Sequence, residues 1–250
     1  MNVFRTISFG VFILSTLGPI QKHKRIIDRA RAEGRDAEEI EWIRLAENFW
    51  GPKILSNWKA EVVRTGETEI PEGGVLFVSN HNGYADIPAF MTAIPEKQFG
   101  FVAKEELMKI PIFSKWIVRI RSIMLLRDDP RIALKVFQEG EDMLGRGFSL
   151  VIFPEGSRAK GLEMQPFQKG SLRMALRTGA PIVPVATKGS WDCFEGGGYP
   201  RPGTIRFHVF PHIETAGLPK SEETALSERI EAIIGKKVEE WKASGGYGAK

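Results

Sequence analysis

Val75-Leu-Phe-Val-Ser-Asn-His-Asn-Gly-Tyr-Ala-Asp86 is the stretch that decides the fold, because an apolar run in it passes directly into polar residues. Such a short run, bounded by turn-forming residues, is typical of a strand buried on both faces. Five further runs of this kind follow along the chain, at 99–103, 122–126, 150–153, 182–185 and 204–210. The last run alternates polar and apolar residues, so we expect it to be half-exposed.

Segments with helical character lie between these runs. We expect helices after Asp86 and Pro111, and over residues 130–144, 171–178 and 221–241. Strands that alternate with helices predict an α/β fold with a mostly parallel central sheet that is flanked by helices. In such a sheet the binding crevice lies at the carboxyl ends of the strands.

The chain divides into three parts by its pattern. We expect an N-terminal two-helix motif that contacts the membrane interface, the α/β domain, and a flexible glycine-rich tail, at residues 1–60, 61–243 and 244–250. The composition is 42% hydrophobic and 26% charged, as in a globular protein with a core. A single cysteine, Cys193, excludes an internal disulfide and a multi-cysteine metal site, and we expect no metal.

The first helix of the motif is apolar from Val3 to Ile20, where Pro19 is expected to end it. At about 1.5 Å per residue this segment reaches roughly 27 Å, just short of the hydrocarbon core. A single N-terminal span, a signal peptide and a helix lying in the interface therefore all stay open. The side chains expected to touch lipid here are Phe4, Phe9 and Phe12.

Basic residues crowd between positions 22 and 35, and the formal net charge is +4. Such a cluster is attracted to an anionic lipid bilayer and favours the cytoplasmic face of the cell membrane. The chain has no recognisable nucleic-acid motif, so we expect no nucleic-acid partner.

A second helix is expected from Asp36, with Glu39 completing a capping box and Gly51-Pro52 interrupting it. Its aromatic residues recur at helical spacing and favour the boundary between water and lipid. Membrane contact is therefore expected for Trp42, Phe49 and Trp50. The alternative is that this stripe packs on the α/β domain.

His81 and Asp86 follow the first strand and are five residues apart. They can meet if His81 lies on the turn before a helix and Asp86 lies in its first turn, and Gly83 makes such a turn easy. Asp86 would then orient the imidazole and leave its other nitrogen free as a general base. The alternative is a capped turn with a structural histidine.

Three other strand ends carry polar residues that suit an anion. Lys104 and Arg127 each follow a strand, and Phe153-Pro-Glu-Gly-Ser-Arg158 follows another. A guanidinium such as that of Arg158 matches phosphate geometry. We therefore expect a site for an anionic substrate beside a general base, formed by Lys104, Arg127, Glu155, Gly156, Ser157 and Arg158.

These blocks resemble those of the glycerolipid acyltransferase family. Asn80-His81 and Asp86 resemble its His-x₄-Asp signature, and residues 153–158 resemble its Phe-Pro-Glu-Gly-Thr/Ser-Arg block. The segment Lys104 to Pro111 with Arg127, and Val183-Pro-Val185, look like the two remaining blocks, in family order. The most similar type is the bacterial 1-acyl-sn-glycerol-3-phosphate acyltransferase (PlsC).

The resemblance implies that an acyl chain passes from an acyl-carrier-protein or coenzyme A thioester to the sn-2 hydroxyl of lysophosphatidic acid, giving phosphatidic acid. His81 would be the general base, Asp86 its orienting residue, and backbone amides near Gly156 the donors to the oxyanion. No metal or redox cofactor is implied. An acyltransferase with another acceptor and a non-catalytic lipid-binding protein are the alternatives.

Overall fold

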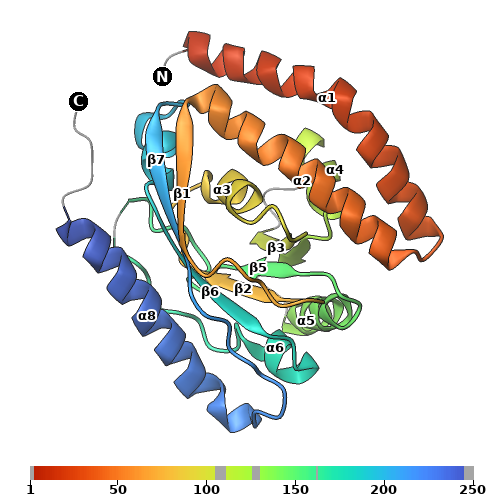
Figure 1. The fold of residues 1–250 in the computed structure, drawn as a ribbon, viewed down its shortest axis with the longest axis vertical. Helices are drawn as coiled ribbons and strands as arrows, with labels where there is room; N and C mark the ends of the chain where they lie inside the picture. The colour runs from red at the N-terminus through yellow and green to blue at the C-terminus, as the bar shows by residue number, and fades with distance from the viewer. Residues whose placement is uncertain (1–2, 105–110, 126–129, 162, 245–250) are drawn as a thin grey trace.

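The structure is a computed structural model that describes residues 3–104, 111–125, 130–161 and 163–244. A seven-stranded sheet forms its centre, in the order β1-β7-β6-β2-β5-β3-β4 (Figure 1). The strands are β1 (Ala60–Gly66), β2 (Leu76–Ser79), β3 (Gly100–Lys104), β4 (Ile123–Leu125), β5 (Leu150–Ile152), β6 (Ile182–Lys188) and β7 (Gly203–Val209). The expected α/β fold with a mostly parallel sheet is confirmed.

Five neighbouring strands, from β6 to β4 in the sheet order, run parallel to one another. Among the strands that the structure describes, only β7 is antiparallel to its neighbour β6, and β1 pairs in parallel with β7 along the edge. The carboxyl ends of the five parallel strands therefore lie on one edge of the sheet, where a binding crevice is expected.

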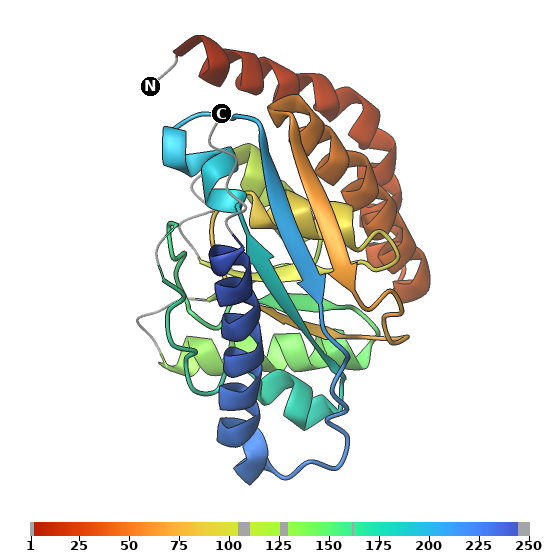
Figure 2. The same ribbon diagram turned by 60° about the vertical axis from the view of Figure 1, so that its left-hand side comes forward.

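Helices cover both faces of the sheet. One face carries α1 (Val3–Ala32), α2 (Asp36–Trp58), α3 (Asp86–Ala93) and α4 (Pro111–Arg119). The other carries α5 (Pro130–Gly145), α6 (Arg173–Thr178) and α8 (Glu223–Ala243). Helix α8 contacts β6, and Figure 2 shows it in dark blue in front of the sheet. A short α7 (Ser190–Cys193), followed by the 3₁₀ turn η2 (Glu195–Gly197), lies between β6 and β7.

Aromatic side chains fill the core between the sheet and α3. Phe90 of α3 packs edge-to-face on Phe77, Phe99 and Phe207, with ring centroids 4.9–6.1 Å apart. All four rings are fully buried. This packing fixes α3, and with it the turn that precedes α3, against the carboxyl edge of the sheet.

Both N-terminal helices run through their prolines, although Pro19 was expected to end the first helix and Gly51-Pro52 to interrupt the second. Helix α1 continues past Pro19, and α2 continues past Pro52. Both prolines are exposed, so water can satisfy the carbonyl that each proline leaves without its helical partner.

The expected capping box at the start of α2 is wrong. Arg35 is the N-cap and makes no side-chain capping bond. The fully buried carboxylate of Glu39 instead accepts from Arg31 of α1 and Arg121 of the loop before β4, at 2.7–2.8 Å. These ion pairs tie the two N-terminal helices to the edge of the sheet.

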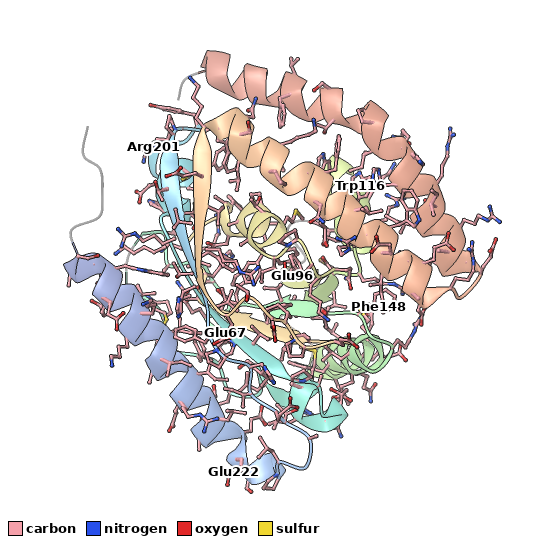
Figure 3. The ribbon with its side chains drawn as sticks, in the orientation of Figure 1. Glu67, Glu96, Trp116, Phe148, Arg201 and Glu222 are labelled. Carbon is pink, nitrogen blue, oxygen red and sulfur yellow. The ribbon has the colours of Figure 1, made fainter. Side chains whose placement is uncertain are left out.

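The aromatic residues expected at the membrane take different positions. Trp50 is buried, and its indole N–H donates to Thr16 at 2.8 Å. Its ring lies 5.2 Å from that of Trp116. Trp116 itself belongs to α4 (Figure 3). The expected membrane contact of Trp50 is therefore wrong. Trp42 and Phe49 are half-buried around His23.

The remaining expected lipid contacts stay predictions. Phe12 is half-buried on α1, and the side chains of Phe4 and Phe9 lie outside the described part of the chain. Among the helices described, none is long and apolar enough to cross a membrane.

Candidate active site

His81 lies in the loop after β2, and its imidazole faces Asp86 at the start of α3. The distance from His81 Nδ1 to Asp86 Oδ2 is 2.8 Å, and the carboxyl of Asp86 is fully buried. The ring of His81 stacks on Phe153 with a centroid distance of 4.0 Å. The described residues offer no partner to Nε2, which leaves this nitrogen open to a substrate.

Asp86 is held by three further hydrogen bonds. Its Oδ2 accepts the backbone N–H groups of Asn82 and Gly83 at 2.7 and 3.0 Å. Its Oδ1 accepts the hydroxyl of Thr187, on β6, at 3.1 Å. A carboxylate that accepts this many hydrogen bonds is held in one orientation toward His81.

Asn80 joins the loop to the neighbouring strand. Its side-chain amide donates to the carbonyl oxygen of Thr187 at 2.9 Å and accepts the backbone N–H of Thr187 at 2.8 Å. The side chain thus continues the ladder between β2 and β6 past the end of β2. The loop that carries His81 is therefore anchored to two strands rather than one.

Glu155 follows β5 and is buried behind His81. Its Oε1 accepts the backbone N–H of His81 at 2.6 Å, and its Oε2 accepts that of Gln165 at 2.7 Å. Burial raises the pKa of Glu155 to about 7, against the opposing effect of these two N–H groups. Glu155 is thus a positioning residue for the His81 loop, and its expected contact with glycerol stays a prediction.

Arg158 lies on the other side of the turn that precedes α3. Its guanidinium pairs with the carboxylate of Glu195 and stacks over the ring of Tyr84, 3.8 Å from the centroid. The other oxygen of Glu195 accepts the backbone N–H of Tyr84 at 2.5 Å. A carboxylate thus occupies a position where a guanidinium and a backbone N–H converge, which are also donors suited to phosphate.

The structure gives less information on the other residues that were expected to bind substrate. Lys104 ends β3 at the same edge of the sheet, but its side chain lies outside the described residues, as does all of Arg127. Gly156 has a φ of 65° and donates its N–H to the carbonyl of Phe153, so this amide is already engaged. Ser157 is exposed.

A cavity of about 350 Å³ opens beside the turn that carries Tyr84. Its walls come from α2, α3, α4 and β3, with Phe194 beside the turn. The walls are almost entirely apolar, with Trp50, Trp58 and Trp116 among the larger side chains. The α2 helix of the N-terminal motif is therefore one wall of this cavity as well as a surface element.

Sequence reasoning did not identify Thr187 and Glu195 as site residues. Thr187 lies two residues beyond the run Val183-Pro-Val185, so extending that strand by its alternation would have brought it to the carboxyl edge. Glu195 lies in an irregular segment without apolar periodicity, and no sequence signal pairs it with Arg158.

Comparisons with known proteins identify the family of this chain. The acyltransferase family model matches residues 61–188. A 1-acyl-sn-glycerol-3-phosphate acyltransferase of Borreliella burgdorferi is 31% identical over 191 residues, which cover 74% of this chain and 75% of the relative. One of Pseudomonas aeruginosa is 28% identical over 194 residues, which cover 77% of this chain and 73% of the relative.

A solved structure shares the fold over nearly the whole length. The crystal structure of the 1-acyl-sn-glycerophosphate acyltransferase PlsC from Thermotoga maritima superposes with a TM-score of 0.72 at 24% identity, covering 98% of this chain and 100% of that one. The family match and the Borreliella relative show that this chain belongs to the acyltransferase family, among the 1-acyl-sn-glycerol-3-phosphate acyltransferases.

Proposed function

We propose that this protein transfers a fatty acyl chain from an acyl thioester to the sn-2 hydroxyl of lysophosphatidic acid, and so forms phosphatidic acid. The observation that carries the proposal is the His81–Asp86 pair, 2.8 Å apart, at the carboxyl edge of the sheet. Tyr84, in the same turn, lines an apolar cavity. The donor is an acyl-carrier-protein or coenzyme A thioester, and the reaction uses no metal or redox cofactor.

In the proposed step His81 acts as general base through Nε2. It takes the proton of the acceptor hydroxyl as that oxygen attacks the thioester carbonyl carbon. The tetrahedral intermediate collapses with cleavage of the C–S bond, and the leaving sulfur receives the proton from His81. Asp86 fixes the ring through Nδ1 and stabilises the imidazolium that forms between the two proton transfers.

Direct transfer fits the nucleophiles that the site offers. Burial raises the pKa of the Cys193 thiol to about 11, so this thiol is a poor nucleophile at neutral pH. The hydroxyl of Ser79 is fully buried and donates to a backbone carbonyl. We therefore propose no covalent acyl-enzyme.

We propose that the phosphate of the acceptor binds Arg158, together with Lys104 and Arg127. The phosphate would replace the carboxylate of Glu195, which forms an ion pair with Arg158 and accepts the backbone N–H of Tyr84. Arg158→Ala should raise KM for lysophosphatidic acid and leave that for a phosphate-free acceptor nearly unchanged. Arg177→Ala is the matched control, since Arg177 is exposed and pairs with Glu141 on the far face of the sheet.

We further propose that the N-terminal helices hold the enzyme on the anionic cytoplasmic surface of the cell membrane. Val11, Lys22 and Arg25 are exposed on α1, which offers both an apolar and a basic contribution to lipid binding. Sedimentation with anionic and with zwitterionic vesicles tests this. Equal binding to both at low salt would contradict the electrostatic part.

The test of the reaction is thiol release from acyl-carrier-protein and coenzyme A thioesters in the presence of lysophosphatidic acid. His81→Ala should lower the acceptor-dependent rate by about 10² or more. His212→Ala is the control, since His212 is exposed and pairs only with Glu214 among the described residues. Equal activity of wild type and His81→Ala would overturn the mechanism. If the protein binds lipid but turns over no thioester, a non-catalytic lipid-binding function is supported. If it turns over only with a different acceptor, the protein is an acyltransferase for that acceptor.

A further inference from the structure

Glu47 is a buried carboxyl in the wall of the cavity that the proposed reaction does not use. It lies on α2 and is 2% exposed. Its Oε2 accepts the backbone N–H of Phe99 at 3.3 Å. Its Oε1 is buried and finds no hydrogen-bond partner among the described residues. An unpaired buried oxygen is rare in native proteins and requires an explanation, and this one belongs to a residue that lines a cavity.

The unpaired oxygen of Glu47 is a donor. Burial raises the pKa of this carboxyl well above its usual value, so the protonated form is favoured. Oε2 acts as the carbonyl oxygen because it already accepts the N–H of Phe99, and the proton therefore belongs on Oε1. A ligand that satisfies this O–H has to bring an oxygen acceptor into an otherwise apolar cavity.

Ser122 provides a second donor in the same cavity. Its hydroxyl oxygen accepts the backbone N–H of Phe101 at 2.9 Å, and the side chain is buried. No acceptor for its own hydroxyl hydrogen is present among the described residues. Glu47 and Ser122 accept the N–H groups of Phe99, just before β3, and of Phe101, within β3. These two N–H groups are two residues apart along an extended chain and point to the same side. The two donors therefore lie in a row along the cavity.

The Glu47 end of this row lies away from the proposed chemistry. Phe99 precedes the first residue of β3, whereas the site lies at the carboxyl ends of the strands. From Phe99 to Ala103 the strand rises roughly 13 Å. With C–C bonds of about 1.5 Å, an extended hydrocarbon chain needs at least about ten carbons to cover that length.

We propose that Glu47 and Ser122 select acyl chains that carry an oxygen substituent, such as a hydroxyl, in their distal half. This inference rests on the acyl transfer proposed above, and it names the chemical class of the donor's chain. An unsubstituted chain leaves the O–H of Glu47 without a partner, whereas a distal hydroxyl accepts from it. Sites that are built to hydrogen-bond a substrate hydroxyl discriminate strongly against the analogue that lacks it.

The experiment compares three acyl thioesters of equal length with lysophosphatidic acid as acceptor. One is unsubstituted, one carries a hydroxyl on the third carbon, and one carries it on about the twelfth carbon. The wild type should have a kcat/KM about tenfold or more higher for the distal hydroxyl than for the other two. Equal values for the distal-hydroxy and the unsubstituted chain would overturn the inference.

Variants separate the role of Glu47 from a purely structural one. Glu47→Met should remove the preference, whereas Glu47→Gln should keep most of it because an amide N–H also donates. Ser122→Ala should reduce the preference, and Ile54→Leu, in the same wall, should leave it unchanged. If the preference for the distal hydroxyl persists undiminished in Glu47→Met, it arises from another residue, and the inference is contradicted.

A binding measurement keeps this test independent of the proposed reaction. Trp50 and Trp116 line the cavity, so free fatty acids can be titrated by tryptophan fluorescence. If no thioester turns over, the proposed function fails, and tighter binding of the distal-hydroxy acid still supports the role of Glu47. If unsubstituted thioesters turn over well and neither assay shows a preference, the function stands and the inference fails.

Discussion

The backbone N–H of His81 donates to Oε1 of Glu155 at 2.6 Å, so a carboxyl on the β5 loop fixes the loop that follows β2. The imidazole of His81 is fixed independently by Asp86, at 2.8 Å. Backbone and side chain of His81 are therefore held by two carboxyls from different parts of the chain. This arrangement allows the two contributions to be separated by substitution.

Glu155→Gln should lower kcat by about tenfold. The two oxygens of Glu155 accept the backbone N–H groups of His81 and Gln165. In the variant the amide nitrogen would face one of these N–H groups. That hydrogen bond would be lost, and its donor would stay buried without a partner. Steady-state kinetics with lysophosphatidic acid measures the effect. Glu163→Gln is the control, because Glu163 is exposed in the same loop region and pairs with Lys242 at the surface. If both variants keep wild-type kcat, the positioning role of Glu155 is wrong.

Glu155 should also make stability depend on pH. Burial raises its pKa to about 7 in the folded protein, above the ordinary value of 4.5. The stability from this group is therefore fully present below about pH 4.5 and is lost as the pH rises through about 7. The difference in unfolding free energy between wild type and Glu155→Gln, measured by urea titration, should fall across this window. A difference in unfolding free energy that stays constant across this pH window would contradict the raised pKa of Glu155.

The His81–Asp86 contact could be predicted from the sequence because it is local. The two residues are five positions apart, and a turn followed by a helix brings them together. The hydrogen bond from Thr187 to Asp86 spans 101 positions, and the pairing of β2 with β6 brings these two residues together. Sequence spacing therefore predicted the pair but not the third residue that holds it.

Strand β1 and the start of α2 could not be predicted from the sequence for a different reason. Residues Ala60–Gly66 form β1 at the edge of the sheet, and most of its side chains are at least partly exposed, so the run lacks the apolar signal of a buried strand. The capping box expected at Glu39 is a local pattern, but two arginines from elsewhere in the chain bind that carboxylate. Tertiary ion pairs prevailed there over the local preference.

Thr187→Val tests directly whether Thr187 helps to hold Asp86. The substitution keeps the shape of the side chain but removes the hydroxyl that donates to Asp86 Oδ1 at 3.1 Å. We expect a loss of about 1–3 kcal/mol in the free energy of unfolding and a severalfold lower kcat. Thr204→Val is the control, since its hydroxyl bonds Glu61 on the exposed edge. Equal effects of the two substitutions would show that Asp86 does not depend on Thr187.

Gly51→Ala should destabilise the contact between α2 and α3, which together form two walls of the cavity. A Cβ at this position would lie 2.4 Å from the Cβ of Met91 and 3.1 Å from the carbonyl oxygen of Pro88, so the helices have to separate. Overpacking of this kind costs about 1–3 kcal/mol, which exceeds the gain of up to about 1 kcal/mol from the better helix propensity of alanine.

Gly18→Ala is the matched control for this prediction, because a Cβ there meets nothing within 4 Å. The control should be neutral or more stable by up to about 1 kcal/mol, since it changes only helix propensity. Urea titration of both variants measures the difference. If Gly51→Ala is as stable as Gly18→Ala, α2 can move away from α3 at little cost, and the cavity wall that α2 provides is adjustable rather than fixed.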